Sequence, residues 1–332
     1  MKPLKNLPVP GLVRWGILGC GNVTELKSGP AFAKVPGSAL MAVMRRDAAK
    51  AADYARRHQV PRWYSDADAL IADADVDAVY IATPPASHKE LALKVAAAGK
   101  LCCVEKPMAL NAAECAEMVQ AFETRGLPLY VAYYRRSLPR FLQLKSWLEQ
   151  GRIGEVRQVH WNFSRMASAQ DLSGQAHWRV DPAVAGGGYF VDLASHGLDL
   201  LMYLLGDMAE VKGFTARQQG LYQAEDAVTA IWRFRSGVLG SGFWNFVSAA
   251  RQDHLSFIGS QGRIDCAVFD EVPLKLTTAE GTQELHMAHP EHIQQPHIAT
   301  MVQDILQGSG HPSTGATALR TNWVMDQILA QA

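Results

Sequence analysis

Short apolar runs alternate with longer amphipathic stretches from Val13 to Val131. Each apolar run is rich in β-branched and aliphatic residues, whereas each amphipathic stretch carries alanine and charge at helical spacing. Strands that are apolar on both faces and alternate with helices are typical of a parallel sheet covered on both sides. The expected strands are Val13–Leu18, Ala39–Met44, Arg62–Tyr64, Ala78–Ile81, Leu101–Val104 and Leu129–Val131, and the expected helices are Asn22–Val35, Asp47–His58, Asp66–Ala72, Ser87–Ala98 and Asn111–Arg125.

A different pattern follows after about residue 135, where short turns containing glycine separate β-rich runs. Such turns join antiparallel strands as hairpins, so we expect a large, open, mostly antiparallel sheet with helices on one face. The fold class is therefore α/β, with one domain over residues 1–132 and a C-terminal α+β domain over residues 133–332. The expected helices are Pro139–Glu149, one opened by Gly186–Gly188 and reaching about Leu205, Ile293–Gln307 and Thr314–Leu329, and the expected strands are Val156–Phe163, Asp226–Phe234, Val238–Val247, His254–Ile258 and Gly262–Cys266.

Two strands of the second domain carry large apolar side chains on both faces. In Asp226–Phe234, Trp232 and Ile231 point to opposite faces, as do Trp244 and Phe243 in Val238–Val247. Helices of the second domain suffice to cover one face only, and an open apolar face marks a contact with another protein. We therefore expect a homo-oligomer, a dimer or a tetramer, packed sheet to sheet.

Charge and composition narrow the function further. The chain of 332 residues holds 32 Lys plus Arg and 32 Asp plus Glu, and this zero balance argues against nucleic-acid binding and against docking to an anionic membrane. No apolar stretch has the length of a membrane helix, and residues 1–13 lack the apolar core of a signal peptide. None of the five cysteines forms a C-x-x-C pair, so we expect a reduced, cytoplasmic protein.

A glycine turn follows the first strand directly and reads Gly19-Cys20-Gly21-Asn22-Val23-Thr24. The first glycine permits a tight turn, the second lets the backbone approach a pyrophosphate, and the next helix offers its amides to the negative charge. Thr24 replaces the third glycine of the pattern, and an ordinary strand-to-helix turn is the alternative. The position inside an N-terminal βαβ unit favours a Rossmann domain that binds NAD or NADP through Gly19, Gly21, Asn22 and Val23.

The end of the second strand bears on the choice of cofactor. An NAD enzyme usually carries an acidic residue here for the ribose hydroxyls, but this chain has Arg45 and Arg46, with Lys50 close behind. Guanidinium groups suit a 2′-phosphate in charge and in hydrogen-bond geometry, so we favour NADP over NAD. Asp47 offers two alternatives, because it can hold an NAD ribose or cap the following helix.

A specific resemblance emerges at Glu105-Lys106-Pro107. Together with the glycine turn, Tyr134-Arg135-Arg136, Trp178-Arg179 and Asp192-x-x-x-His196-x-x-Asp199, this motif resembles the Gfo/Idh/MocA family of oxidoreductases over nearly the whole chain. That family includes glucose–fructose oxidoreductase, inositol dehydrogenases, 1,5-anhydrofructose reductase and dimeric dihydrodiol dehydrogenase. The resemblance also implies pairing or tetramer formation through the C-terminal sheet. Thr24 and Arg45 depart from the family pattern, and these two departures affect only how the cofactor and its phosphate are bound.

Lys106 follows a buried strand and precedes a proline. A lysine at the carboxyl edge of a parallel sheet lies where ligands bind in open α/β folds, and its ammonium group can hydrogen-bond a substrate oxygen. A surface lysine paired with Glu105 is the alternative from the residues alone. The family resemblance implies that Lys106 is catalytic.

Asp192, His196 and Asp199 share one face of an expected helix. A carboxylate one turn before a histidine can orient the imidazole for general acid–base work. Three alternatives remain: Asp192 caps the helix, His196 is a core histidine, or the three residues bind a metal. No metalloenzyme motif accompanies them, so we expect no metal, and the resemblance implies catalytic roles for Asp192 and His196.

Further residues enter through the resemblance. It implies that a loop running alongside the cofactor contains Thr83, Pro84 and His88, although the same loop can simply cap a helix. It also assigns cofactor contacts to Glu105, Lys106, Tyr134, Trp178 and Arg179. A cluster of histidines at positions 286, 289, 292 and 297 is expected to form a loop, with His292 or His297 near the substrate.

The function that follows is an NAD(P)-dependent dehydrogenase or reductase. It would transfer a hydride between nicotinamide and a carbinol or carbonyl carbon of a sugar, cyclitol or related polyol, with His196 as general base, Lys106 at the substrate oxygen and Asp192 orienting His196. Two alternatives use the same fold: an NAD-dependent glycoside hydrolase and a non-enzymatic NADP-binding sensor. The catalytic trio argues against the sensor.

Overall fold

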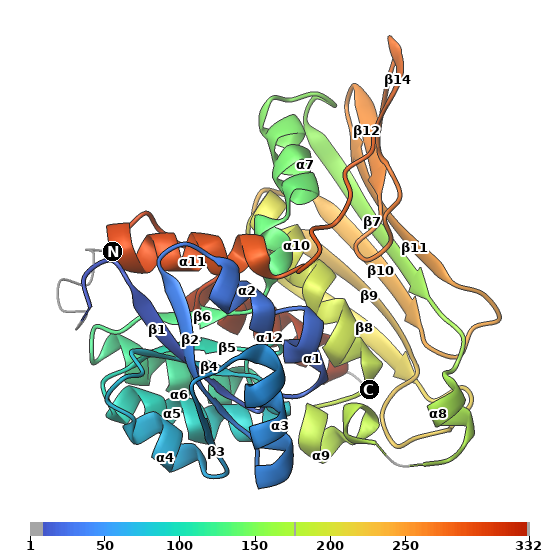
Figure 1. Ribbon diagram of the computed structural model, residues 1–332. Helices are drawn as coiled ribbons and strands as arrows, with labels where there is room; N and C mark the ends of the chain where they lie inside the picture. The colour runs from blue at the N-terminus through green and yellow to red at the C-terminus, as the bar shows by residue number, and fades with distance from the viewer. Residues whose placement is uncertain (1–8, 176, 331–332) are drawn as a thin grey trace. The chain divides into compact units, whose positions relative to one another are not determined.

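The computed structural model describes residues 9–175 and 177–330 and divides the chain into two compact units (Figure 1). Unit 1 comprises Met1–Leu138 and Pro290–Leu319, and unit 2 comprises Pro139–His289 and Arg320–Ala332. The sequence analysis placed one boundary after residue 132, so the division differs in that a C-terminal segment returns to unit 1. The reason is packing, because helix α11 (Gln295–Gln307) buries Ile298 and Met301 in the core of that unit.

Unit 1 contains the expected six-stranded sheet, in the order β3-β2-β1-β4-β5-β6, with every pairing parallel. The predicted strand positions are confirmed, whereas the expected helix Asn22–Val35 is two helices separated by Lys27 and Ser28. The strands are β1 (Val13–Leu18), β2 (Ser38–Met44), β3 (Arg62–Tyr64), β4 (Ala78–Ile81), β5 (Leu101–Val104) and β6 (Leu129–Val131). The helices are α1 (Asn22–Leu26), α2 (Gly29–Lys34), α3 (Ala48–His58), α4 (Ala67–Ala72), η1 (Pro85–Ser87), α5 (His88–Ala97), α6 (Ala112–Glu123) and η2 (Tyr134–Ser137).

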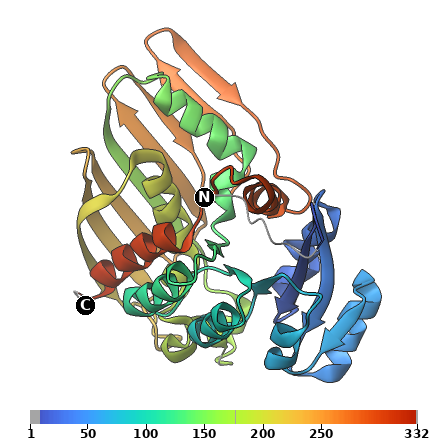
Figure 2. The same cartoon turned by 90° about the vertical axis from the view of Figure 1, so that its left-hand side faces the viewer.

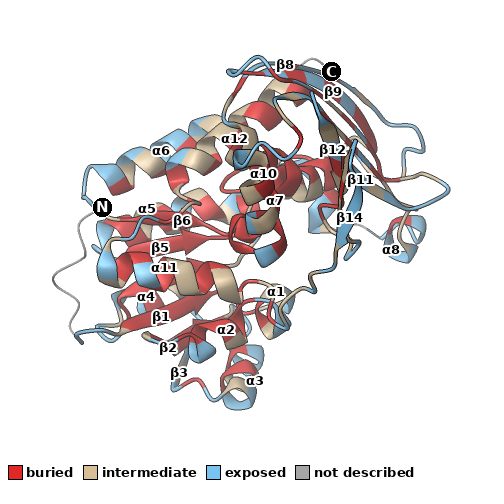
Figure 3. Cartoon of the chain, turned by 90° about the horizontal axis from the view of Figure 1, so that it is seen from above, coloured by how far each residue is buried: buried red, intermediate tan, exposed pale blue. Residues whose placement is uncertain are grey.

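Helices cover both faces of this sheet, which explains why its strands are apolar throughout. On one face α2 and α11 bring Phe32 and Met301 against Trp15 of β1, and on the other face α5 brings Val95 against Val79 of β4. Figure 3 shows the strands as almost continuously buried. The strand order reverses between β1 and β4, and ligands bind at such a point in open α/β sheets.

Unit 2 contains an eight-stranded sheet in the order β14-β13-β12-β11-β7-β10-β9-β8, antiparallel except for the pairing of β10 with β7. The sequence analysis did not predict β13 and β14 at one end of the sheet or β8 at the other end. The strands are β7 (Val156–Ser164), β8 (Met208–Ala216), β9 (Ala227–Phe234), β10 (Leu239–Asn245), β11 (Gln252–Gly259), β12 (Gly262–Cys266), β13 (Leu274–Thr278) and β14 (Gly281–Leu285). The helices are α7 (Pro139–Glu149), α8 (Ala169–Leu172), η3 (Trp178–Val180), α9 (Pro182–Ala185), the π-helical turn η4 (Phe190–Ala194) and α10 (Ser195–Leu205), and α12 (Gly315–Leu329) crosses the division between the units.

Only one face of this second sheet is buried under helices. Helix α10 approaches so closely at Gly197 that a Cβ there would lie 2.2 Å from the Trp161 ring of β7. Figures 1 and 2 show α7, in green, on one side of the sheet. Along β9 burial alternates, with Trp232 buried and Ile231 exposed. Within the described residues, no helix combines the length and apolarity needed to span a membrane.

Candidate active site

The glycine turn after β1 has two glycines that differ in their surroundings. Gly19 has φ +86°, and a Cβ there would lie 2.7 Å from Thr83 Cγ2 and 3.0 Å from the Thr83 backbone nitrogen. At Gly21 a Cβ would meet no atom closer than the Gly19 carbonyl oxygen at 3.8 Å. Gly19 is therefore required by the fold, whereas Gly21 leaves open space beside the backbone, as a pyrophosphate requires.

Thr24, which replaces the third glycine of the pattern, is fully buried. Its hydroxyl donates to the Gly21 carbonyl oxygen at 2.8 Å, and its own carbonyl accepts from the Tyr54 hydroxyl of α3 at 2.8 Å. Close packing occurs instead at Gly29, where a Cβ would lie 2.2 Å from the Thr24 carbonyl oxygen and 2.3 Å from the Tyr54 hydroxyl. Gly29 is thus the position where α2 touches its neighbours, a role that the sequence pattern did not reveal.

The basic residues after β2 remain accessible. Arg46 and Lys50 are exposed, and Arg45 is half-buried beside the Cys20 carbonyl oxygen, at 3.4 Å. Asp47 caps α3 by accepting from the Lys50 backbone N–H at 3.1 Å, and its carboxylate also lies 3.2 Å from the Lys50 ammonium. These hydrogen bonds lower the pKa of Asp47 and commit its carboxylate to the helix end. The capping alternative for Asp47 is therefore the one that the structure supports.

Lys106 is the second residue after β5 and is half-buried, and its bond to Pro107 is cis. Its backbone N–H donates to the Glu105 carboxylate at 3.1 Å. Glu105 is 7% exposed and also accepts from the buried Tyr80 hydroxyl and from the Gln294 side chain. The structure therefore uses Glu105 to shape the loop, and this favours a supporting role over the predicted cofactor contact.

His88 is also buried, whereas Pro84 and Thr83 of the preceding loop are exposed and half-buried, respectively. One ring nitrogen lies 2.8 Å from the Thr83 carbonyl oxygen, and the other lies 3.1 Å from that of Pro107. Burial lowers the pKa of His88, and the neighbouring carbonyl groups oppose this effect. His88 thus joins the loop after β4 to the loop after Lys106, which favours a supporting role for this residue as well.

The candidate acid–base residues of unit 2 lie at the junction of η4 and α10. Asp192 belongs to the π-helical turn, and its carboxylate lies 3.7 Å from the Arg179 guanidinium, which stacks over the Trp178 ring at 4.5 Å. His196 is 4% exposed, with its ring edge-on to Phe269. Arg179, Trp178 and Asp192 therefore form one partly exposed group.

Asp199 lies three residues after His196 on α10. It is fully buried and accepts from the Thr321 hydroxyl of α12 at 3.1 Å. The sequence analysis left the role of Asp199 open, and the hydrogen bond to Thr321 shows that Asp199 also joins α10 to α12. In the part of the chain that the structure describes, no group of three or more His, Cys, Asp or Glu side chains is arranged to hold a metal ion.

Asp171 organises the segment that carries Trp178 and Arg179, and the sequence analysis missed it. Its buried carboxylate accepts from the Ser168 hydroxyl at 2.6 Å, the Tyr189 hydroxyl at 2.8 Å and the His177 ring at 2.9 Å. Burial acts to raise the pKa of Asp171, but these hydrogen bonds outweigh it and lower that pKa. Ser168 and Asp171 form a capping box at the start of α8, and the pattern Ser168-x-x-Asp171 is the sequence signal from which Asp171 could have been found.

Three further residues that the sequence analysis placed near the cofactor or the substrate are Tyr134, His292 and His297. Tyr134 is 6% exposed, with the Arg135 guanidinium over its ring at 5.0 Å. His292 has its ring nitrogens 2.7 Å from the Leu26 carbonyl oxygen and 2.6 Å from the Lys34 ammonium. His297 is fully buried. The contacts of His292 join the segment before α11 to α1 and α2, and the expected contact of His292 or His297 with substrate stays a prediction.

Comparisons with known proteins agree with this geometry. A model described as "Oxidoreductase family, NAD-binding Rossmann fold" matches residues 13–133, and a "GFO/IDH/MocA C-terminal domain" matches residues 141–265. Oxidoreductase P35 of Formosa agariphila is 36% identical over 317 residues, covering 95% of this chain and 97% of that protein. Trans-1,2-dihydrobenzene-1,2-diol dehydrogenase of Bos taurus is 32% identical over 252 residues, covering 75% and 72%.

A solved structure, "Levoglucosan dehydrogenase, complex with NADH and levoglucosan", shares the fold with a TM-score of 0.87 and 23% identity, covering 96% of each chain. Fold, glycine turn and similarity together define an NAD(P)-dependent oxidoreductase with a Rossmann domain. The chain belongs to the Gfo/Idh/MocA family. The family, the fold class and the enzyme class expected from the sequence are thereby confirmed.

Proposed function

We propose that this oxidoreductase acts on a sugar, cyclitol or related polyol and prefers NADP(H). One observation carries the proposal: Gly19, Thr83 and Lys106 follow the neighbouring strands β1, β4 and β5 at the carboxyl edge of one parallel sheet. That edge, where the strand order reverses, is where open α/β folds bind dinucleotides and their reaction partners. Two relatives, the dihydrobenzenediol dehydrogenase named above and a levoglucosan dehydrogenase that is 29% identical over 277 residues, support a cyclic carbinol as the substrate class.

The proposed roles divide between cofactor and protein. When bound, the nicotinamide supplies the hydride chemistry, and Gly21, Asn22 and Val23 hold its pyrophosphate. In oxidation His196 accepts the proton of the substrate hydroxyl, and the Lys106 ammonium stabilises the negative charge that develops on that oxygen. Asp192 orients His196. In reduction the same groups act in the opposite direction.

The preference for NADP(H) rests on charge. Arg45 and Arg46 stand where an acidic ribose ligand would stand in an NAD enzyme; Arg46 is exposed and Arg45 is half-buried. Asp47 is committed to capping α3 and to Lys50, so it is a poor ligand for ribose hydroxyls. A 2′-phosphate would find two guanidinium groups at this position.

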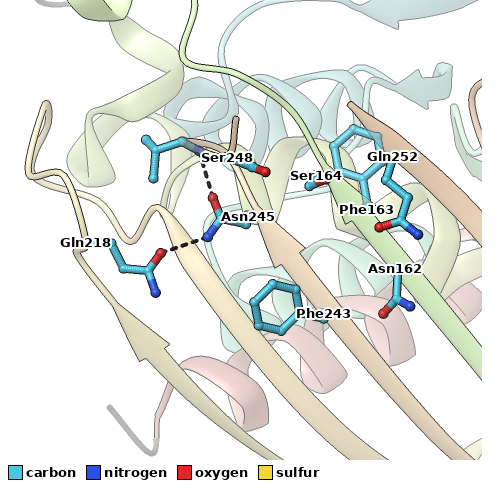
Figure 4. A pocket seen from close by; sticks show the side chains of 9 residues that line it. Asn162, Phe163, Ser164, Gln218, Phe243, Asn245, Ser248 and Gln252 are labelled. Atoms are coloured by element: carbon cyan, nitrogen blue, oxygen red, sulfur yellow. Dashed lines mark hydrogen bonds between the residues drawn. The ribbon is translucent and has the colours of Figure 1, made fainter. Parts of the chain in front are cut away.

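We further propose that two copies pair through the open face of the sheet in unit 2. Exposed apolar side chains on that face are Phe214, Ile231, Leu239 and Phe243, which are between 45% and 74% exposed. A surface pocket of about 460 Å³ is lined by Phe243, Asn245 and Gln218, among others, and Asn245 donates to Gln218 at 2.8 Å. Figure 4 shows these side chains around the pocket. Apolar side chains around a polar depression are typical of a surface that packs against another protein. All five cysteines are buried thiols, which fits the cytoplasmic location expected from the sequence.

The test is a screen of sugars, inositols and dicarbonyl compounds with NADPH and NADH, followed by nicotinamide absorbance. With the best substrate, Lys106→Ala and His196→Ala should each lower kcat by roughly 10²–10⁴-fold while cofactor affinity changes little. Lys94→Ala, which removes an exposed lysine on α5, is the matched control. Turnover close to wild type in Lys106→Ala or in His196→Ala would remove that residue from its proposed role. Cleavage of a glycoside without net oxidation or reduction of the cofactor would instead support the hydrolase alternative.

A further inference from the structure

A buried hydrogen-bond network joins three distant segments of unit 1 at the carboxylate of Glu105. The Gln294 side chain, which precedes α11, donates to Glu105 Oε1 at 2.8 Å. The Tyr80 hydroxyl of β4 donates to the same oxygen. Glu105 Oε2 accepts from the backbone N–H of Lys106. Tyr80 is fully buried and Gln294 is 2% exposed, so water does not compete for these bonds.

Every hydrogen bond of this network that Glu105 makes is one in which its carboxylate accepts. Burial, followed by the nearby charge of Glu105, raises the pKa of Tyr80 well above its ordinary value, so the phenol remains a donor. Gln294 donates through its amide and the Lys106 backbone donates through its N–H, so Glu105 is surrounded by donors. Each hydrogen-bond donor that a buried carboxylate loses leaves one of its oxygens without a partner, which costs free energy.

Gln294 is also tied to the helix that follows the glycine turn. Its backbone N–H donates to the Lys27 carbonyl oxygen at 3.2 Å, just beyond α1. Two residues earlier, His292 contacts the neighbouring Leu26 carbonyl oxygen at 2.7 Å. The segment 292–294 therefore connects the end of the dinucleotide-binding helix to the residue that precedes Lys106.

We propose that Gln294 is a positioning residue, which holds the Glu105 carboxylate and through it the backbone at Lys106. The inference rests on the proposed function, in which the Lys106 side chain contacts the substrate oxygen. An amide is suited to this place because it donates to a carboxylate without adding charge. Glutamate at position 294 would bring a second carboxylate to the same buried oxygen, and methionine would remove the donor.

The first readout is hydrogen exchange of the protein without cofactor, measured by mass spectrometry on peptides that contain the Lys106 amide. Gln294→Met should speed exchange at that amide roughly 10-fold or more, as expected for losing a hydrogen bond to a charged acceptor. Gln303→Met, an exposed glutamine on α11, is the matched control and should leave the exchange unchanged. Tyr80→Phe removes the other donor and should act in the same direction, which keeps the test open if Gln294→Met folds poorly.

The second readout is kinetic. Gln294→Met should lower kcat roughly 10-fold and leave the dissociation constant of the cofactor within about twofold, because a misplaced ammonium group affects chemistry more than cofactor binding. Unchanged exchange at Lys106 in both Gln294→Met and Tyr80→Phe would overturn the proposal, and so would an unchanged kcat in Gln294→Met. Lys106→Ala, assayed in parallel, separates the two claims: if it retains full turnover, the proposed function fails, whereas the exchange result still decides the role of Gln294.

Discussion

Two buried imidazoles make the stability of unit 1 depend on pH. His297 of α11 and His311 lie with their rings edge to face, 4.7 Å between centroids, and the Tyr130 ring lies 5.2 Å from His311. Asp304 accepts from the Tyr130 hydroxyl at 2.9 Å, and Arg136 donates to the Pro312 carbonyl oxygen beside them. Burial lowers the pKa of His311 to about 4 and that of His297 well below its ordinary value. The charge of Arg136 acts in the same direction on both, and Asp304 partly opposes it at His311.

The sign of the effect follows from these directions. In the unfolded chain both histidines bind a proton near pH 6.5, whereas in the folded protein they resist protonation. The unfolded state therefore gains protons first as pH falls, and stability is lost below about pH 6.5 until the folded pKa is reached. For His311 the interval from 6.5 to about 4 corresponds to about 3 kcal/mol, at roughly 1.4 kcal/mol for each pH unit. About 2 kcal/mol of this is lost between pH 8 and pH 5.

The assay compares thermal unfolding of wild type and His311→Asn at pH 8 and at pH 5. Asparagine removes the titrating ring but retains an acceptor for the Ser313 backbone N–H, which His311 Nδ1 binds at 3.1 Å. For a unit of this size 1 kcal/mol corresponds to roughly 2–4 °C, so wild type should lose about 4–8 °C more than the variant. His254→Asn, at a half-exposed position in β11, should lose as much as wild type. Equal losses in wild type and His311→Asn would refute the reasoning.

Three further predictions concern the cofactor site and the assembly. Gly21→Ala should leave the melting temperature within about 1 °C of wild type and weaken cofactor binding roughly 10-fold. Gly19→Ala should lower the free energy of unfolding by about 1–3 kcal/mol, measured by denaturant unfolding, because its Cβ would meet Thr83. A Gly19→Ala variant as stable as wild type would contradict that crowding. Arg45→Ala and Arg46→Ala should each weaken NADPH roughly 10-fold and NADH little, as titrated by tryptophan fluorescence, and equal losses for both cofactors would remove the preference. Phe243→Glu should convert a dimer or tetramer to a ~36 kDa monomer in light scattering, and a monomeric wild type at micromolar concentration would disprove the pairing.

The elements of unit 1 are well predicted because β1, β4, β5 and β6 are buried along their whole length and three of the longer amphipathic stretches begin with a capping side chain. Asp47, Asp66 and Asn111 cap their helices through side-chain oxygens, as their position before an amphipathic stretch indicates. The strands of unit 2 are harder. β14 is exposed along almost its whole length, so it lacks the alternation of apolar and polar residues that marks a half-buried strand. Pairing with β13 alone defines it, and pairing leaves no pattern in a single sequence.

In the candidate site, too, local motifs could be predicted from the sequence but contacts between distant residues could not. The glycine turn and the motif around Lys106 are local, so the sequence reveals them directly. Gln294 reaches Glu105 from 189 residues away, and nothing near Gln294 in sequence marks it as a partner. Helical spacing likewise predicts which face carries Asp199, but the hydrogen bond that it accepts from Thr321, 122 residues away, has no signal in the sequence. The π-helical turn at Asp192 likewise has no sequence signal of its own.

The central claim is that the protein moves a hydride between a nicotinamide and one carbon of a cyclic carbinol or carbonyl compound. The most direct test uses NADPH that carries deuterium at the transferable position of the nicotinamide, with the best carbonyl substrate from the screen and mass spectrometry of the product. The account predicts one deuterium on the new carbinol carbon of the product, and a greatly reduced yield with Lys106→Ala. A product formed at the wild-type rate without deuterium, or formed equally well by Lys106→Ala, would contradict it.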